Sequence, residues 1–185
     1  MDKILFINAC VRPNSRTLEL ATHVLSKLKG DIEEVKLFDA NVRPLDKKGL
    51  EMRDKASIDR DYSSSEFLFA KQFAESDVIV IATPYWDLMF PAVVKAYFEN
   101  VTVSGLTFSY SESGIPYGLC KAKRLIYVTT AGGPIIHNFG FDYVSTLAKC
   151  FYGINDVQLV KAEGLDIYGA DVANIIETAK KTVKL

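Results

Sequence analysis

The stretch DVIVIATP, residues 77–84, decides the fold class of this chain. It is a short apolar run, rich in β-branched residues and ended by a proline, as expected for a strand that is covered on both faces. A second run of this kind, KILFIN at 3–8, lies near the start of the chain. Strands of this type belong to parallel sheets with a layer of helices on each side, so the stretch predicts an α/β fold.

Apolar runs alternate with segments of helical spacing along the rest of the chain. We predict further strands at 32–38, 123–133 and 157–162, and helices at 17–30, 63–76, 92–102, 141–152 and about 170–183. This alternation predicts right-handed crossovers, and hence a doubly wound five-stranded parallel sheet with helices on both faces. Ser64 or Ser65 is expected to cap the second helix.

Two stretches break this alternation. Residues 39–62 are charged and weakly periodic, and we expect a long connection with at most one helical turn. Residues 105–120 are polar, aromatic and glycine-bearing, and we interpret them as an excursion that could hold a hairpin.

The composition limits the class of protein. With 185 residues and 49% hydrophobic content, the chain is long enough for a core, and we expect residues 1–185 to form a single domain. Its 22 Lys and Arg residues against 23 Asp and Glu give a net charge of −1, which argues against nucleic-acid and membrane-surface binding. No apolar run is long enough to cross a bilayer, and the opening MDKILFINAC fits a strand better than a signal peptide.

The cysteines, Cys10, Cys120 and Cys150, are odd in number and have no C-x-x-C spacing. We therefore expect neither a disulfide framework nor a metal site, and we interpret the chain as a cytoplasmic protein with reduced thiols.

Three loops are expected at the carboxyl ends of the strands, where doubly wound sheets bind their ligands. The first loop, NACVRPNSRT at 8–17, leads into a helix whose free N–H groups and dipole favour an anion. Two arginines and two hydroxyls strengthen that prediction: Arg12, Arg16, Ser15 and Thr17. The alternative is an ordinary helix cap with two solvated arginines.

The first loop also matches C-x5-R-[ST], the signature of a cysteine phosphatase, through Cys10 and Arg16. That chemistry needs a low-pKa thiolate and a ring of backbone N–H groups. Pro13 supplies no N–H, the loop has no glycine, and the chain has no Asp-Pro pair to provide the acid. A phosphatase is therefore a remote alternative.

The second and third loops carry aromatic residues and paired glycines. The second loop, TPYWDLMFP at 83–91, could form a wall for a flat ring or pack against a subunit. The third loop, TTAGGPIIHN at 129–138, lets the backbone approach a ligand closely. His137 is our candidate proton donor, the alternative being a solvated loop histidine. A Walker-A lysine loop and a G-x-G-x-x-G after the first strand are both absent.

Together the three loops resemble the flavodoxin-like NAD(P)H:quinone oxidoreductases, and within them the FMN-dependent NADH-azoreductase group. ACVRPNSRT is similar to the family's phosphate loop, with Cys10 where serine is usual. ATPYWDLMFPAVVKAYFENVTVSGLTFSY resembles its isoalloxazine loop with the helix that follows, and TTAGG its third flavin loop. FYGINDVQLVKAEGL resembles its last strand region.

The resemblance implies a flavodoxin-like sheet of strand order 2-1-3-4-5 and a set of FMN contacts. The phosphate would lie on Arg12, Ser15, Arg16 and Thr17. The ring would lie between two groups of residues: Pro84, Tyr85, Trp86, Asp87 and Leu88 on one edge, and Thr130, Ala131, Gly132 and Gly133 on the other. Asp87 stands where asparagine is usual and Trp86 where tyrosine is usual, so flavin potential and acceptor choice are the least transferable properties.

The resemblance further implies an FMN-dependent enzyme that passes two electrons from NADH or NADPH to a quinone, azo or similar flat acceptor by ping-pong hydride transfer. It implies a homodimer with its site at the interface, and we expect residues 105–120 and 83–91 to form the contact. The alternatives are a flavodoxin-type electron carrier, against which the net charge of −1 argues, and a non-catalytic flavin sensor.

Overall fold

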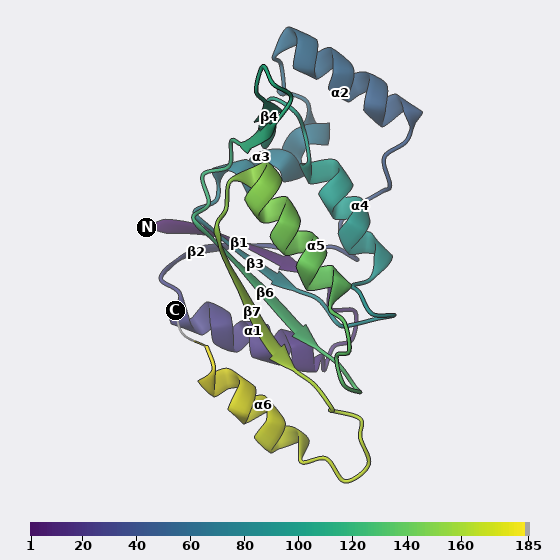
Figure 1. Ribbon diagram of the computed structural model, residues 1–185, viewed down its shortest axis with the longest axis vertical. Coiled ribbons are helices and arrows are strands. Elements are labelled where there is room, and N and C mark those ends of the chain that lie inside the picture. Colours follow the sequence, from purple (N-terminus) through teal and green to yellow (C-terminus); the bar gives the residue numbers. More distant parts are fainter. Residues whose placement is uncertain (184–185) are drawn as a thin grey trace.

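A computed structural model describes residues 1–183 and contains a five-stranded parallel sheet (Figure 1). The sheet has the order β2-β1-β3-β6-β7. Its strands are β1 (Asp2–Asn8), β2 (Gly30–Lys36), β3 (Val78–Ala82), β6 (Arg124–Thr130) and β7 (Asp156–Ala162). Counted within this sheet, the order is the expected 2-1-3-4-5, so the flavodoxin-like topology is confirmed.

Helices cover both faces of the sheet, as predicted. In Figure 1, α1 (Arg16–Lys27) and α6 (Val172–Lys181) lie below it, and α3 (Leu68–Glu75), α4 (Ala92–Val101) and α5 (Phe139–Leu147) lie above it. A 3₁₀ turn, η1 (Ser65–Phe67), precedes α3, and a π-helical turn, η2 (Ala148–Tyr152), extends α5. The Ser64 side chain, one of the two predicted caps, caps η1 by accepting from the Glu66 N–H, whereas α3 itself has no side-chain cap.

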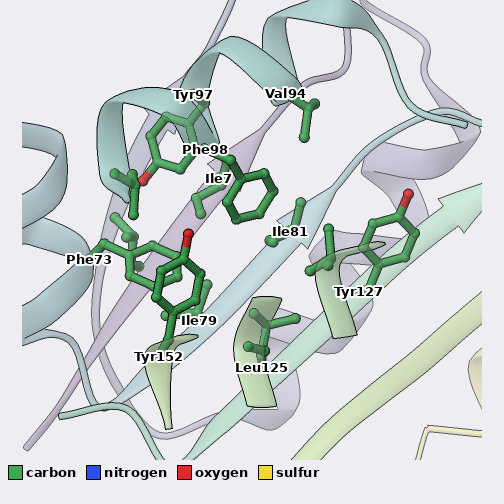
Figure 2. Close-up of a cluster of buried hydrophobic side chains, with 14 of the residues drawn as sticks. Ile7, Phe73, Ile79, Ile81, Val94, Tyr97, Phe98, Leu125, Tyr127 and Tyr152 are labelled. Carbon is green, nitrogen blue, oxygen red and sulfur yellow. The ribbon is translucent and has the colours of Figure 1, made fainter. Parts of the chain in front are cut away.

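Alternate residues of each strand pack into two separate hydrophobic cores, one on each face of the sheet. Because both faces of a strand are covered, its sequence is a continuous apolar run. Ile4 and Phe6 of β1 pack toward α1 and α6, whereas Leu5 and Ile7 pack toward the opposite helices. Figure 2 shows the second core, where Ile7, Ile79 and Ile81 meet a group of aromatic side chains: Phe73, Tyr97, Phe98, Tyr127 and Tyr152.

The prediction for residues 39–62 was wrong, because this segment contains the 13-residue helix α2 (Lys47–Asp59). Only Ala56 of the helix is buried, so no apolar stripe marks it in the sequence. Polar contacts hold it instead. Asp46 caps its start by accepting from the Gly49 N–H at 2.8 Å, and Arg53 donates to the carbonyl oxygens of Glu99 and Thr102 at the end of α4.

Residues 105–120 contain the anticipated hairpin, formed by β4 (Phe108–Tyr110) and β5 (Pro116–Gly118). A Cβ on Gly118 would meet the backbone of Tyr152 and Gly153 at 2.1–2.2 Å, so only glycine allows the hairpin to lie against η2. The hairpin lies beside α3, away from the ends to which the strand arrows point (Figure 1). Among residues 1–183, no helix has the length and apolar character to span a membrane.

Candidate cofactor site

A pocket of about 310 Å³ lies at the carboxyl ends of the strands, where the predicted loops meet. A fourth loop, residues 163–171 between β7 and α6, forms the remaining wall. The pocket is lined by Cys10, Val11, Arg12, Asn14, Ser15, Arg16, Thr17, Pro84, Tyr85, Trp86, Thr130, Ala131, Gly132, Leu165 and Asp166. Most of the residues predicted to contact a cofactor are therefore brought together, although Asp87, Leu88 and Gly133 are not among the lining residues.

The first loop is fixed at its start by Asn8, a buried residue at the end of β1. The Asn8 carboxamide donates to Glu34 Oε1 at 2.8 Å and accepts from the Cys10 N–H at 2.9 Å. The Ala9 N–H donates to the Ala82 carbonyl at 2.8 Å. These bonds tie the loop to β2 and β3, so its path is set before any ligand binds.

The first loop ends at the N-terminus of α1, which Ser15 caps. Its Oγ accepts from the Leu18 N–H at 3.2 Å, and its carbonyl accepts from the Glu19 N–H at 3.0 Å. Within residues 1–183, the N–H groups of Arg16 and Thr17 have no acceptor, so they are available to an anion. The cap and the free N–H groups are both expected of an ordinary helix, and it is the presence of Arg12 and Arg16 in the same pocket lining that favours an anionic ligand.

Thr17 and Thr130 link the first and third loops. Their Oγ1 atoms lie 2.6 Å apart, and both side chains are buried. One hydroxyl donates to the other, so the pair keeps one hydrogen to offer elsewhere. Thr129, the other threonine considered for this loop, is also buried and does not line the pocket.

The fourth loop holds the third one in place through its backbone. The Leu165 N–H donates to the Ala131 carbonyl at 3.2 Å, and the Asp166 N–H donates to the Gly132 carbonyl at 2.8 Å. A Cβ on Gly132 would lie 2.2 Å from Asp166 Oδ2, so the glycine makes room for this carboxylate. Arg16 Nη1 reaches the same place, donating to the Leu165 carbonyl at 3.1 Å and to Asp166 Oδ1 at 2.7 Å.

Leu165 and Asp166 were not predicted as site residues. The sequence offered one signal, the AEGL that ends the stretch resembling the family's last strand region. No spacing rule pairs Asp166 with Arg16, because they lie 150 residues apart and meet only through the strand order.

The second loop turns sharply between Trp86 and Met89, whose N–H and C=O groups bond reciprocally at 2.9 and 2.8 Å. Both central residues have positive φ, 50° at Asp87 and 68° at Leu88, as in a type I′ turn. Their N–H groups have no acceptor within the described part of the chain. Trp86 and Leu88 are each 43% exposed. The loop thus offers peptide donors and an aromatic wall, and it leaves the apolar side chains of Trp86 and Leu88 exposed.

His137 lies outside the pocket lining and is exposed. Its backbone carbonyl accepts from the Tyr85 hydroxyl at 2.8 Å, and its ring stacks on Phe139 with centroids 5.4 Å apart. The side chain has no hydrogen-bond partner among the residues described. Its catalytic role stays a prediction.

Cys10 does not have the environment of a phosphatase nucleophile. Burial raises the pKa of its thiol, an effect that the hydrogen bond with Ser15 opposes and the charge of Glu34 reinforces. The Sγ atom lies 3.9 Å from the Ala82 carbonyl, a group that does not stabilise a thiolate. A neutral thiol near pH 7 is a poor nucleophile, so the chemistry of the site argues against this alternative.

Within residues 1–183, no three His, Cys, Asp or Glu side chains are grouped so as to hold a metal ion.

Comparison with known proteins agrees with this geometry. Residues 2–185 match the family described as having the flavodoxin-like fold. The FMN-dependent NADH:quinone oxidoreductase of Coprothermobacter proteolyticus is 36% identical, with 98% of this chain and 96% of the relative covered. The protein of the same name from Lachnoclostridium phytofermentans is 32% identical, with coverages of 100% and 98%.

Solved structures show the same fold at lower identity. An azoreductase from Bacillus anthracis str. Sterne has a TM-score of 0.86 at 23% identity, with 98% of this chain and 96% of that chain covered. An FMN-dependent NADH-azoreductase from Bacillus anthracis str. Ames Ancestor, in complex with FMN, has a TM-score of 0.81 at 24% identity, with coverages of 98% and 95%. The resemblance inferred from the three loops is thereby confirmed: this chain belongs to the flavodoxin-like fold family and, within it, to the family of FMN-dependent NADH:quinone oxidoreductases.

Proposed function

We propose that this protein is an FMN-dependent oxidoreductase that takes electrons from NADH and passes them, in pairs, to quinone, azo or similar flat acceptors. The observation that carries the proposal is a single pocket with free helix N-terminal N–H groups at one end and an aromatic loop at the other. Curated relatives that cover nearly the whole chain carry the name of this activity.

The donor set of the first loop fits the phosphate of FMN. The N–H groups of Arg16 and Thr17 lack acceptors within residues 1–183, and Arg12, Arg16 and Ser15 line the same end of the pocket. Peptide N–H groups at a helix start, two guanidinium groups and a hydroxyl together form an anion site. We assign the phosphate to this loop.

The second and third loops fit the isoalloxazine ring. Pro84, Tyr85 and Trp86 form one side of the pocket, and Thr130, Ala131 and Gly132 form another. Asp87 and Leu88 are not among the lining residues, but their N–H groups, which have no acceptor within residues 1–183, are donors that ring heteroatoms can use. Gly133 offers its backbone beside this edge. Bound FMN would supply the hydride chemistry that no side chain of the chain provides.

The protein's own part in the reaction is to hold the ring, orient the reactants and keep water away. Tyr85 is fixed for this task at both ends, because its N–H donates to the Thr130 carbonyl at 3.0 Å and its hydroxyl to the His137 carbonyl at 2.8 Å. Trp86, more exposed, is placed to stack on a flat donor or acceptor. With one open face, NADH and the acceptor would use the same space in turn, which gives ping-pong kinetics. His137 is the candidate proton donor.

We also propose a homodimer, in which the second copy covers the apolar side chains around the second loop. Trp86, Leu88, Ile136 and Phe139 are 43–73% exposed, and the Phe139 N–H bonds to the Leu88 carbonyl, so these residues belong to one surface. The hairpin of residues 105–120 lies at the other end of the strands. Of the two expected dimer contacts, we therefore favour the one at the second loop. We propose a single FMN-binding domain over residues 1–185, located in the cytoplasm.

The test is an anaerobic visible spectrum of FMN-reconstituted protein before and after adding NADH, with free FMN as the control. Prompt bleaching of bound flavin, followed by recovery on adding a quinone, is expected. Bound flavin that NADH and NADPH both leave unchanged would indicate a carrier or sensor and contradict the enzyme. Parallel double-reciprocal plots would support the ping-pong order, and light scattering after gel filtration would measure the oligomeric state.

A further inference from the structure

We infer that Asp166 is a positioning residue for the cofactor phosphate, acting through Arg16. It holds the Arg16 guanidinium across the end of the pocket, so that the remaining N–H groups of this side chain can bind the phosphate. The inference rests on the proposed function, because it uses the assignment of the phosphate to the first loop.

The geometry of Arg16 supports this role. A single nitrogen, Nη1, makes both contacts with the fourth loop, 3.1 Å to the Leu165 carbonyl and 2.7 Å to Asp166 Oδ1. Within residues 1–183, Nε and Nη2 have no acceptor. Since a guanidinium carries five N–H donors in a rigid plane, fixing one nitrogen orients the three donors that stay free.

The backbone that carries Asp166 is held in place independently of the arginine. The Asp166 N–H donates to the Gly132 carbonyl at 2.8 Å, and the neighbouring Gly164 N–H donates to the Gly133 carbonyl at 3.1 Å. Gly132 has no Cβ where Asp166 Oδ2 lies, 2.2 Å from the position such an atom would take. The fourth loop therefore fixes the position of Asp166, from which its carboxylate reaches Arg16 Nη1.

The exposure of the pair argues that its importance lies in binding and not in folding. The side chains are 41% exposed at Arg16 and 71% exposed at Asp166, and ion pairs this exposed contribute little to folding stability. A long side chain that must meet a phosphate, however, loses less freedom on binding if it is already held in place.

The opposite effect is the main alternative, since the negative charge of Asp166 could compete with the phosphate for Arg16. Two observations favour positioning. Competition would be expected to occupy the fork of the guanidinium, whereas only Nη1 is used. Arg12 also lines this end of the pocket, so the local charge stays positive with Asp166 ionised.

The experiment measures binding of FMN and of riboflavin, which lacks the phosphate, to apoprotein by quenching of flavin fluorescence. Asp166→Ala is expected to weaken FMN binding about three- to tenfold, the range for a lost hydrogen bond, and to leave riboflavin binding within about twofold of wild type. Asp166→Asn keeps an acceptor oxygen and is expected to restore most of the FMN affinity. In an Arg16→Met background, Asp166→Ala is expected to have no further effect.

A matched control is Asp156→Ala, which removes another Asp–Arg ion pair, the one with Arg124 at 2.6 Å, at the start of β7 and far from the fourth loop. It should leave both affinities unchanged. FMN binding as tight as or tighter than wild type in Asp166→Ala, or an equal loss for riboflavin, would overturn the inference alone. Wild-type protein that binds riboflavin and FMN equally would overturn the phosphate assignment, and protein that binds neither would overturn the proposed function.

Discussion

The first loop forms most of its polar contacts within the protein, whereas the second loop leaves donors and aromatic surface exposed. Asn8, Arg16 and Thr17 each bond to a distant part of the chain, and Ser15 caps α1. The second loop closes on itself through Trp86 and Met89 and exposes its central residues at positive φ. The first-loop end of the pocket is therefore fixed by bonds within the protein. The second-loop end has donors and apolar surface that a ligand or a second copy can cover.

This difference separates stability from selectivity. Changes at the buried first-loop residues Asn8 and Thr17 remove bonds within the folded protein, so they should lower the free energy of unfolding even without cofactor. Changes in the second loop remove surface that only a ligand or partner covers, so they should alter binding and leave the apoprotein as stable as before. Substitutions in the two loops test that separation.

Replacing Asn8 by Ala should have the largest effect on stability. The change removes both hydrogen bonds of a buried side chain, the one to Glu34 Oε1 and the one from the N–H of the half-buried Cys10. We expect a loss of about 1–3 kcal/mol in the free energy of unfolding, measured by urea denaturation of the apoprotein. Asn41→Ala, at an exposed asparagine, is the control. Equal midpoints for the two variants would mean that the first loop is not held from β1.

Replacing Thr17 by Val tests the link between the first and third loops. Valine keeps the shape but leaves the Thr130 hydroxyl without the partner it has at 2.6 Å. We expect a loss of about 1–2 kcal/mol, partly recovered in the Thr17→Val/Thr130→Val double variant, because removing both hydroxyls leaves no unpaired polar group. Thr22→Val, at an exposed position of the same helix, should change stability by less than about 0.5 kcal/mol. A double variant less stable than the two single losses combined would contradict this account.

The first two predictions concern contacts that sequence alone indicated only in part. The strands were predictable because β3 and β6 are covered on both faces and so read as continuous apolar runs. The loops followed from the strand order, since ligands bind at the carboxyl ends. The helix α2 was not predictable by periodicity, because it is held by Arg53 and the Asp46 cap instead of an apolar stripe.

The site itself was predictable to the level of loops but not of side-chain directions. Asp87 and Leu88 lie in the predicted loop, but they are the exposed central residues of the turn that Trp86 and Met89 close, and they do not line the pocket. Asp166 was missed because its place in the site depends on how distant strands are arranged. Its contact with Arg16 exists only because β7 lies at the edge of the sheet next to β6, which places the fourth loop beside the third.

Replacing Trp86 by Ala should leave the apoprotein almost unchanged in stability, by less than about 0.5 kcal/mol, because the side chain is 43% exposed. FMN and riboflavin binding should both weaken, by about three- to tenfold, since a stacking surface for the ring is lost. This pattern differs from the phosphate-selective loss expected for Asp166→Ala. Ile58→Ala on α2, at an 81% exposed residue, is the control for loss of an exposed apolar side chain. A loss of FMN affinity without a loss for riboflavin would place Trp86 at the wrong end of the pocket.

Replacing Cys10 by Ser should have the smallest effect. Cys10 lines the phosphate end of the pocket, and a serine hydroxyl fits the same space with a better donor, so FMN binding and NADH oxidation should be retained.

Burial raises the pKa of the Cys10 thiol and raises that of Cys120 to about 12, so both should stay protonated near neutral pH and gain thiolate only as the pH rises. Iodoacetamide should therefore modify the exposed Cys150 first, as read by mass spectrometry of the digested protein, and FMN should slow modification of Cys10 further. Two results together would contradict this account: rapid alkylation of Cys10 at neutral pH, and hydrolysis of p-nitrophenyl phosphate that Cys10→Ser abolishes. They would make the first loop a phosphatase active site and not a binding site for the cofactor phosphate.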